Sequence, residues 1–286
     1  MNYRPKLIAI GIALATLSAL GCQEKPGPTT TTGTPASAGD KQAQGKAILA
    51  KMSDKLKSAQ AATFTTVETA DRVRRNNERK KLNLTRQIAM RRPDRLWFKV
   101  TGDRDLEAFY DGKKVTLLSH KEKVFGEFPA APTLDETTDR ITTRYNIPLP
   151  VADLLTYDPQ TSFVDENTTG GLDRQETLDG VVCNVLAYQH PKVDFSIWIP
   201  ASGDPLPKKL DVTYKARRGQ PATSIMFKDW NLSPSVSDVT FTPVVPNGYE
   251  GIPVIQRASS VIADRRAEEK AGTAKEATPV VPRRRS

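Results

Sequence analysis

Few residues in this 286-residue chain could do acid–base, nucleophilic or metal chemistry, since it holds only two histidines and two cysteines. His120 and His190 lie far apart in predicted turns, where solvated side chains are expected, and neither stands in a motif that would orient it against a nucleophile. Zinc sites, haem c attachment and disulfide scaffolds need more cysteine or histidine. No phosphate-binding loop, Rossmann glycine pattern, HExxH or GxSxG motif occurs. We therefore predict a protein that is not an enzyme and that uses no metal or cofactor.

Cys22 stands where covalent lipid chemistry is expected. Two basic residues precede residues 7–20, a run of 14 uncharged residues that is too short to span a bilayer with margin and is typical of a secretory signal. Gly21 directly before Cys22 resembles the bacterial lipobox, in which the cysteine thiol is acylated and the cysteine becomes the first residue after cleavage. The alternative is an ordinary signal peptide with a chance cysteine. We predict a lipid anchor at Cys22. By resemblance to the enteric sorting rule, Gln23 rather than aspartate after the cysteine implies the outer membrane in a source with two membranes.

The second cysteine, Cys183, lies in an apolar run at residues 181–185 that is predicted to be a strand. If Cys22 is acylated, Cys183 has no partner left for a disulfide. A reactive thiol needs nearby positive charge that strand neighbours do not supply. We predict a buried, inert thiol.

The net charge of +9 is concentrated in one segment. Residues 72–95 hold ten basic and two acidic residues, a local net charge of +8. We expect no nucleic-acid partner, because the domain is secreted and the segment lacks aromatic residues that could stack on bases. The remaining polyanions are lipid or glycolipid headgroups, and the predicted contacts with them are Arg74, Arg75, Arg79 and Lys80. The alternative is a solvated hairpin that its charge keeps soluble and unpaired.

The distribution of apolar residues divides the chain into four parts. Residues 1–22 form the predicted lipoprotein signal, residues 23–40 a disordered tether rich in threonine and proline, and residues 257–286 a disordered basic tail. The remaining residues, 41–256, are numerous enough for one sizeable core. We therefore predict a single folded domain on a membrane tether.

This domain is predicted to be mainly β with few helices. Apolar residues recur at helical spacing over residues 45–59, a capping box at Thr133 opens a helix that reaches about Tyr145, and residues 151–157 form a short third helix. Nine or ten antiparallel strands are expected, at residues 64–73, 81–90, 95–100, 105–110, 114–119, 124–128, 180–188, 194–199, 209–214 and 223–230, with an edge strand near 241–243. Strands and helices do not alternate, which disfavours a parallel sheet.

One face of the predicted sheet is suited to line a cavity. Its candidate ligand-binding residues are Leu82, Leu84, Arg86, Ile88 and Met90 of one strand and Leu96 and Phe98 of the next, and Val100 also fits a cavity wall. Arg86 is the exception on this apolar face, so it lies either at the rim of a cavity or beside an acidic group. A plain hydrophobic core fits the same pattern and is the commoner fate of such faces.

Short motifs in a fixed order resemble an uncharacterised family of bacterial predicted periplasmic proteins that is related to LolA, LolB and RseB. They are RRPDRL at 91–96, FYDGK at 109–113, PLPVADLL at 148–155, LDGVVC at 178–183, PLPKKL at 205–210 and DWN at 229–231. The resemblance covers about residues 45–249. It implies an incomplete antiparallel β-barrel with helices on or in its concave face, and a cavity that suits acyl chains.

Two functions follow as hypotheses. The first is a non-enzymatic lipoprotein, anchored on the periplasmic side of the envelope at the outer membrane, that binds an acyl chain, a lipid or a lipoprotein in the half-barrel. The alternative is an envelope sensor or scaffold that acts through protein contacts or anionic surfaces, using residues 72–95 and the basic tail. The sequence names no protein partner.

Overall fold

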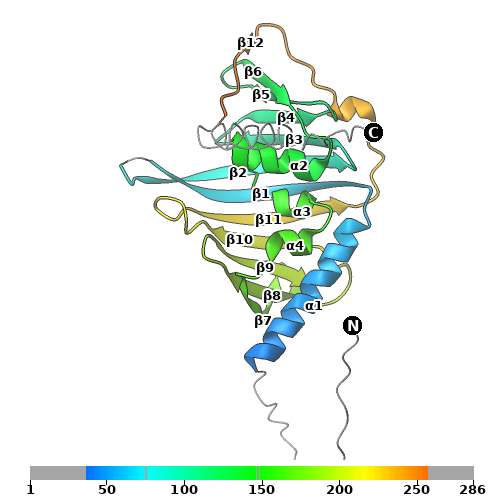
Figure 1. Ribbon diagram of the computed structural model, residues 1–286, viewed down its shortest axis with the longest axis vertical. Helices are drawn as coiled ribbons and strands as arrows, with labels where there is room; N and C mark the ends of the chain where they lie inside the picture. Colours follow the sequence, from blue (N-terminus) through cyan, green and yellow to red (C-terminus); the bar gives the residue numbers. More distant parts are fainter. Residues whose placement is uncertain (1–36, 75, 146, 148, 257–286) are drawn as a thin grey trace, which may run out of the picture. The chain divides into compact units, whose positions relative to one another are not determined.

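The computed structural model describes residues 37–74, 76–145, 147 and 149–256, which form a twelve-stranded sheet with helices on one face (Figure 1). The strands are β1 (Ala61–Val73), β2 (Arg79–Arg91), β3 (Arg95–Gly102), β4 (Leu106–Tyr110), β5 (Lys114–Ser119), β6 (Val124–Pro129), β7 (Thr169–Leu178), β8 (Val181–Gln189), β9 (Asp194–Pro200), β10 (Lys209–Thr213), β11 (Ala222–Asn231) and β12 (Glu250–Gly251). The helices are α1 (Ala38–Lys57), α2 (Leu134–Asp139), α3 (Ala152–Leu155) and α4 (Pro159–Phe163), with a π-helical turn η1 (Arg140–Arg144) and a 3₁₀ turn η2 (Asp238–Phe241). The predicted fold class, mainly β with few helices, is confirmed.

Two antiparallel meanders meet in the middle of the sheet. The strand order is β12-β6-β5-β4-β3-β2-β1-β11-β10-β9-β8-β7, so β1 to β6 extend in one direction and β11 to β7 in the other. Strand β1 joins the halves, because it pairs with β2 along its whole length and with β11 from Thr63 to Ala70. The sheet is open, since its edge strands β12 and β7 do not pair with each other. Among the described strands, β12 and β6 form the single parallel pair.

Most of the helices come from the insert between β6 and β7, and they lie over the same face of the sheet as α1 (Figure 1). Thr133 caps α2, because its hydroxyl accepts a hydrogen bond from the backbone amide of Glu136 at 3.3 Å. The chain continues through η1 to Arg144, which confirms the helix predicted from Thr133 to about Tyr145. The predicted third helix is confirmed as the shorter α3.

Helix α1 begins at Ala38, earlier than the predicted start at residue 45. Ser37 and Asp40 form a reciprocal capping box, in which the Asp40 amide donates to the Ser37 hydroxyl at 3.2 Å and the Ser37 amide donates to the Asp40 carboxylate at 3.1 Å. The first turn of the helix therefore lies in residues that the sequence assigned to the tether. The early start escaped prediction because this turn has no apolar face, so the cap is its main signal.

Two strands were missed, and one segment was predicted wrongly. Strand β7 is an edge strand with mostly exposed or half-buried side chains, so it lacks the apolar alternation that marks a strand. The two-residue β12 is too short to give a pattern. The edge strand predicted near residues 241–243 is wrong, because Phe241 ends the 3₁₀ turn η2. The short helix α4, which begins with Pro159, was also not predicted.

The main hydrophobic core lies between the sheet and the helices. It includes Leu49, Met52 and Leu56 of α1 together with strand residues such as Phe98, Ile197 and Ile225. A second, small cluster of Cys183, Val185 and Trp198 lies on the opposite face of the sheet, because alternate residues of a strand point to opposite faces. The helices thus cover one face, and any enclosed space between the layers lies there.

Candidate functional site

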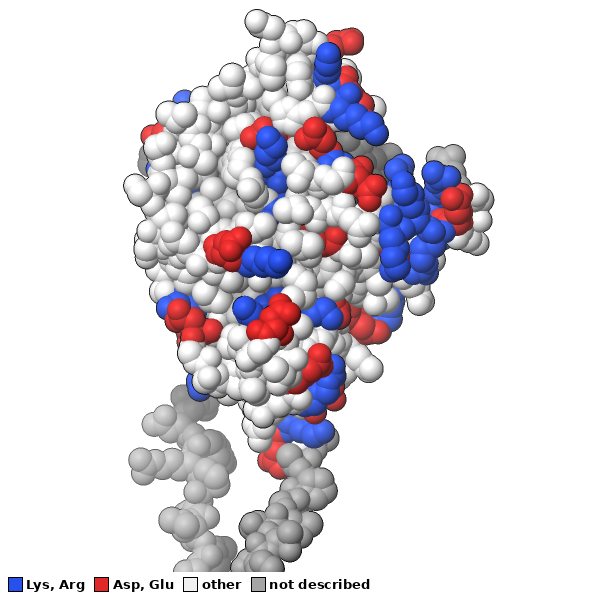
Figure 2. Space-filling model, turned by 180° about the vertical axis from the view of Figure 1, so that it is seen from behind, with Lys and Arg blue, Asp and Glu red and all other residues white. Residues whose placement is uncertain are grey.

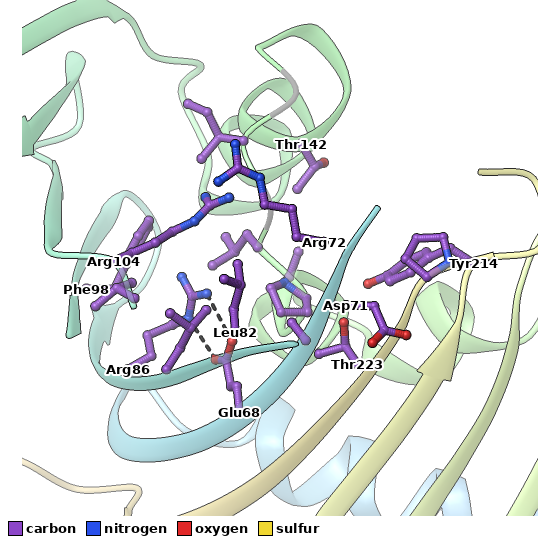
Figure 3. A pocket seen from close by; sticks show the side chains of 18 of the residues that line it. Glu68, Asp71, Arg72, Leu82, Arg86, Phe98, Arg104, Thr142, Tyr214 and Thr223 are labelled. Atoms are coloured by element: carbon purple, nitrogen blue, oxygen red, sulfur yellow. Dashed lines mark hydrogen bonds and ion pairs between the residues drawn. The ribbon is translucent and has the colours of Figure 1, made fainter. Parts of the chain in front are cut away.

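A cavity of about 310 Å³ lies between the sheet and the segment that connects η1 with α3 (Figure 3). Eleven of its twenty-one lining residues are apolar, among them Leu82, Leu84, Phe98, Val100, Leu106, Ile147, Leu149 and Ala152. The polar lining residues are Glu68, Asp71, Arg72, Arg86, Arg104, Thr142, Asp153, Tyr214, Arg217 and Thr223. An apolar wall with a few charged groups is the usual composition of a small-molecule site.

Hydrogen bonds fix the helical wall of the cavity to the sheet. The Arg92 guanidinium at the end of β2 donates from Nη2 to the carbonyl oxygen of Thr156, directly after α3, at 2.8 Å. The backbone amide of Leu134 donates to the carbonyl oxygen of Pro93 at 2.8 Å, which holds the start of α2 over the β2–β3 turn. The motif RRPDRL at residues 91–96 thus positions α2 and α3, and α3 contributes Ala152 and Asp153 to the cavity lining.

Arg86 forms a buried ion pair with Glu68 in the sheet wall (Figure 3). Arg86 Nε and Nη2 donate to the two carboxylate oxygens of Glu68 at 2.9 and 3.2 Å, and the side chains are only 4% and 1% exposed. The Thr66 hydroxyl donates to Glu68 at 2.6 Å, and the Arg86 guanidinium lies 5.2 Å from the centre of the Phe98 ring. Of the two alternatives for Arg86, the structure shows the pairing with an acid; Arg86 also lines the cavity, but as a buried residue and not at its rim.

Two further arginines border the same end of the cavity. Arg72 lies near the end of β1 and Arg104 in the β3–β4 turn, and their side chains extend toward one another in Figure 3. Within the described ranges, neither guanidinium has a hydrogen bond or an ion pair with a carboxylate. Burial, and then repulsion from Arg72 and Arg86, lowers the pKa of Arg104. Because Glu68 is engaged by Arg86, this end of the cavity carries excess positive charge.

Asp153 of α3 contributes an acidic group to the cavity. Asp153 is exposed by its accessible surface, part of which borders the cavity, while protein atoms pack densely around its carboxylate. Burial raises the pKa of Asp153 to about 6, and burial also raises the pKa of Tyr214, which lines the same wall. Among the described residues, no side chain forms a hydrogen bond or ion pair with the Asp153 carboxylate. The Asp153 carboxyl group therefore changes its protonation state at about pH 6.

The predicted ligand-binding residues divide into two groups. Leu82, Leu84, Arg86 and Phe98 line the cavity, as does Val100. Ile88, Met90 and Leu96 do not line it and belong to the packed core. All of them share one face of the sheet, but the cavity spans only the part of the strands near the β1–β2 turn. Alternation predicts the face that a residue occupies, and it does not predict where along the strand the covering layer leaves space.

Nine of the ten charged or polar residues that line the site were not singled out from the sequence as ligand-binding residues, among them Glu68, Arg72, Arg104, Asp153 and Tyr214. Only Glu68 had a usable signal. Glu68 lies on the same inward face of β1 as Phe64 and Thr66. An acidic residue on this face could have been recognised as a partner for Arg86 on the inward face of the neighbouring strand β2. Arg104 lies in a turn, where charge is ordinary.

Only the first part of the predicted basic segment, residues 72–74 and 76–81, lies at the tip of the β1–β2 hairpin, where blue side chains gather at one edge of the view in Figure 2. Arg74 and Lys80 are exposed, while Arg79 binds Asp71 at 2.5 Å and the carbonyl oxygen of Gly219 at 2.7 Å. Arg218 of the β10–β11 loop donates to Asn77 at 3.0 Å. We call Arg74, Lys80, Lys81, Arg217 and Arg218 the basic tip. Arg75 lies outside the described residues, and so does Cys22.

The histidines and Cys183 lie outside the cavity. His120 contacts Glu107 at 3.0 Å and Tyr249 at 2.8 Å, and His190 lies 3.5 Å from Asp165. The expectation that both histidines are merely solvated is therefore wrong, because each is partly buried beside a carboxylate. Cys183 is fully buried in β8, and burial raises the pKa of its thiol, as expected for an inert cysteine.

No group of three or more histidine, cysteine or acidic side chains in the described part of the chain could hold a metal ion. A search of those same residues finds no helix with the length and apolar content needed to cross a membrane.

Comparison with known proteins adds a family and several similar folds. The family model described as predicted periplasmic protein (DUF2092) matches residues 45–255. No curated protein matches the chain.

Three solved structures illustrate the similarity of fold. A LolA superfamily protein from Nitrosomonas europaea is 11% identical with a TM-score of 0.34, over 70% of this chain and 98% of that one. The lipoprotein LppX of Mycobacterium tuberculosis is 10% identical with a TM-score of 0.40, over 67% and 97% of the two chains. A chain of the MucA/MucB complex of Pseudomonas aeruginosa is 11% identical with a TM-score of 0.39, over 70% of this chain and 61% of that one.

Proposed function

The chain belongs to the DUF2092 family of predicted periplasmic proteins, and from this premise we propose that it is a non-enzymatic envelope lipoprotein that binds a hydrophobic ligand between its sheet and its helices. The cavity of about 310 Å³ carries this proposal. It lies beside the packed core on the same face of the sheet, and apolar side chains of four strands, β1 to β4, and of the α3 segment enclose it.

The volume of the cavity limits the kinds of ligand that it can hold. Ligand cavities measure roughly 300–1,000 Å³, so this one is at the lower end of the range. A single acyl chain fits such a space better than the several chains of a lipoprotein anchor. The open end near the β1–β2 turn would leave the polar part of the ligand accessible.

The position of the protein in the envelope follows from the lipobox at Cys22. An acylated Cys22 would hold the domain at the membrane, because each buried CH₂ contributes about 0.8 kcal/mol to anchoring. Gln23 favours the outer membrane. A domain held there would meet lipids at high local concentration, which suits a small apolar cavity.

The test is native mass spectrometry of the full chain carrying Cys22→Ser, so that any bound lipid is not covalent. We expect an additional mass that organic extraction releases. Ala70→Leu places extra carbon atoms in the cavity from β1 and should abolish the additional mass, whereas Val182→Leu at an exposed position of β8 should keep it. A chain that carries no extractable lipid and fails to bind added fatty acids would refute the proposal.

A second candidate function is contact with an anionic membrane surface through the basic tip. The observation in its favour is that the β10–β11 loop adds Arg217 and Arg218 to the hairpin, so residues distant in sequence gather on one surface. Each basic residue near an anionic membrane contributes about 1 kcal/mol, so the charge reversals Arg74→Glu and Lys80→Glu together should weaken binding to phosphatidylglycerol vesicles about 30-fold or more. Lys46→Glu with Lys51→Glu on α1 is the matched control. Equal loss in both double variants would show that only net charge matters.

A further inference from the structure

The charges at the open end of the cavity are not balanced by the protein. Four arginines line the cavity, and Arg86 is neutralised by Glu68. Asp71 is engaged by Arg79 and Lys81 and by the backbone amide of Ala222. Asp153 also lines the cavity, but no ion pair joins it or any other carboxylate of the described residues to Arg72 or Arg104. Like charges held close together favour an anion between them.

We propose that Arg72 and Arg104 bind the anionic headgroup of a single-chain amphiphile, a carboxylate or a phosphate monoester, whose hydrocarbon chain occupies the apolar part of the cavity. This inference rests on the proposed function, since it assigns the ligand class of the same cavity.

The arrangement of the strands supports a ligand whose headgroup lies at the two arginines and whose hydrocarbon chain extends further into the cavity. In the β1–β2 pair, Arg72 lies opposite Lys80, Ala70 opposite Leu82 and Glu68 opposite Leu84. The β3–β4 turn that carries Arg104 is held beside β2, because the Asn83 amide donates to the Asp103 carboxylate at 2.8 Å. Moving inward from the two arginines, a ligand therefore meets apolar side chains first and the neutralised Glu68–Arg86 pair afterwards.

The chemistry of the guanidinium group supports this assignment. Its planar set of N–H donors matches the oxygen atoms of a carboxylate or phosphate, and such charge-assisted hydrogen bonds are stronger than neutral ones. The cost of withdrawing Arg104 from water is already met in the free protein, as its lowered pKa indicates. An alcohol or an ester of the same chain length would gain no comparable interaction.

The experiment compares decanoate, decyl phosphate and decanol, each below the concentration at which it aggregates, by titration calorimetry of the full chain carrying Cys22→Ser. We expect the two anions to bind about 10-fold to 100-fold more tightly than decanol, the range for one charge-assisted hydrogen-bonded contact. Arg72→Ala and Arg104→Ala should each remove most of this difference without weakening the binding of decanol. Arg218→Ala, an arginine of the basic tip that does not line the cavity, is the control.

The outcomes separate this inference from the proposed function. Tighter binding of decanoate than of decyl phosphate, or the reverse, identifies the headgroup and supports the inference in both cases. Equal binding of all three compounds overturns the inference and leaves the apolar cavity as the proposed site. Selective binding of anions that survives Arg72→Ala and Arg104→Ala overturns the assignment to these residues. If none of the three binds, the proposed function itself is refuted.

Discussion

The carboxylate of Glu68 on β1 and the guanidinium of Arg86 on β2 form a two-point ion pair, at 2.9 and 3.2 Å, inside the wall of the cavity. Their residues are not direct partners in the strand register, because Glu68 lies opposite Leu84 and Arg86 opposite Thr66. The pair is therefore diagonal, and the Thr66 hydroxyl completes it by donating to Glu68. Arg86 is thus held in place by its neighbours on β1 rather than by solvent.

Removing only one partner of this ion pair should lower the free energy of unfolding strongly. Arg86→Met leaves the Glu68 carboxylate buried without its counter-charge, and we expect a loss of about 3–5 kcal/mol in the free energy of unfolding, measured by urea denaturation. Glu68→Leu combined with Arg86→Met removes both charges and should recover most of that loss. Arg174→Met, which breaks exposed ion pairs with Asp173 and Glu176 on β7, should cost no more than about 1 kcal/mol. A double variant as unstable as Arg86→Met alone would contradict this account.

Helix α1 lies so close to β7 that no side chain fits between them at Gly45. A Cβ atom on Gly45 would come within 2.6 Å of the Gly171 Cα, and one on Gly171 would come within 2.4 Å of the Lys41 carbonyl oxygen. We expect Gly45→Ala to lower the melting temperature, because both obstacles are backbone. A Cβ at Gly39, in the first turn of the same helix, would meet only the Ser37 hydroxyl oxygen, at an ordinary contact distance of 3.8 Å, so Gly39→Ala should leave stability unchanged or raise it by up to about 1 kcal/mol. Equal effects at both positions would argue against the close helix–strand contact.

The Asp153 carboxylate should make stability depend on pH. Its pKa is raised from 3.8 to about 6, so the folded state holds a proton that the unfolded state has released over this range. The resulting stabilisation is present at low pH and is lost as the pH rises through about 6. Asp153→Asn should therefore match the wild-type melting temperature near pH 4 and exceed it at pH 7. Asp54→Asn, at an exposed position of α1, should show no such difference between the two pH values.

The two cysteines should behave in opposite ways. We expect Cys22→Ser to abolish the incorporation of labelled palmitate in cells and to release the protein from the membrane fraction. Cys183→Ser should leave both properties unchanged, because Cys183 is buried in the small cluster with Val185 and Trp198. Palmitate retained in Cys22→Ser would contradict the lipobox reading.

Local patterns were sufficient to predict most of the strands and one cap. Alternation of apolar and polar residues located β2, and the Thr133 capping box located α2, because both signals act over a few residues. The same patterns failed for β7 and for the first turn of α1. In those segments the structure depends on pairing with β8 and on the Ser37–Asp40 cap rather than on an apolar face.

The candidate site was predictable only in part. Leu82, Leu84, Arg86 and Phe98 were recognisable, because they share one face of adjacent strands. The contributions of Arg104, Asp153 and Tyr214 were not, since these residues come from a turn, a short helix and a loop that only the folded chain brings together.

The sequence by itself therefore determined a basic, mainly β chain with a strongly charged hairpin and an apolar strand face interrupted by Arg86. The lipobox at Cys22 stays a prediction. The tertiary structure decided which part of that face stays open, that Glu68 neutralises Arg86, and that Arg72 and Arg104 converge at the rim. The physical reason is the range of the interactions. Strand alternation and helix capping depend on neighbours along the chain, whereas a cavity and its charge balance depend on contacts between segments that are far apart in sequence.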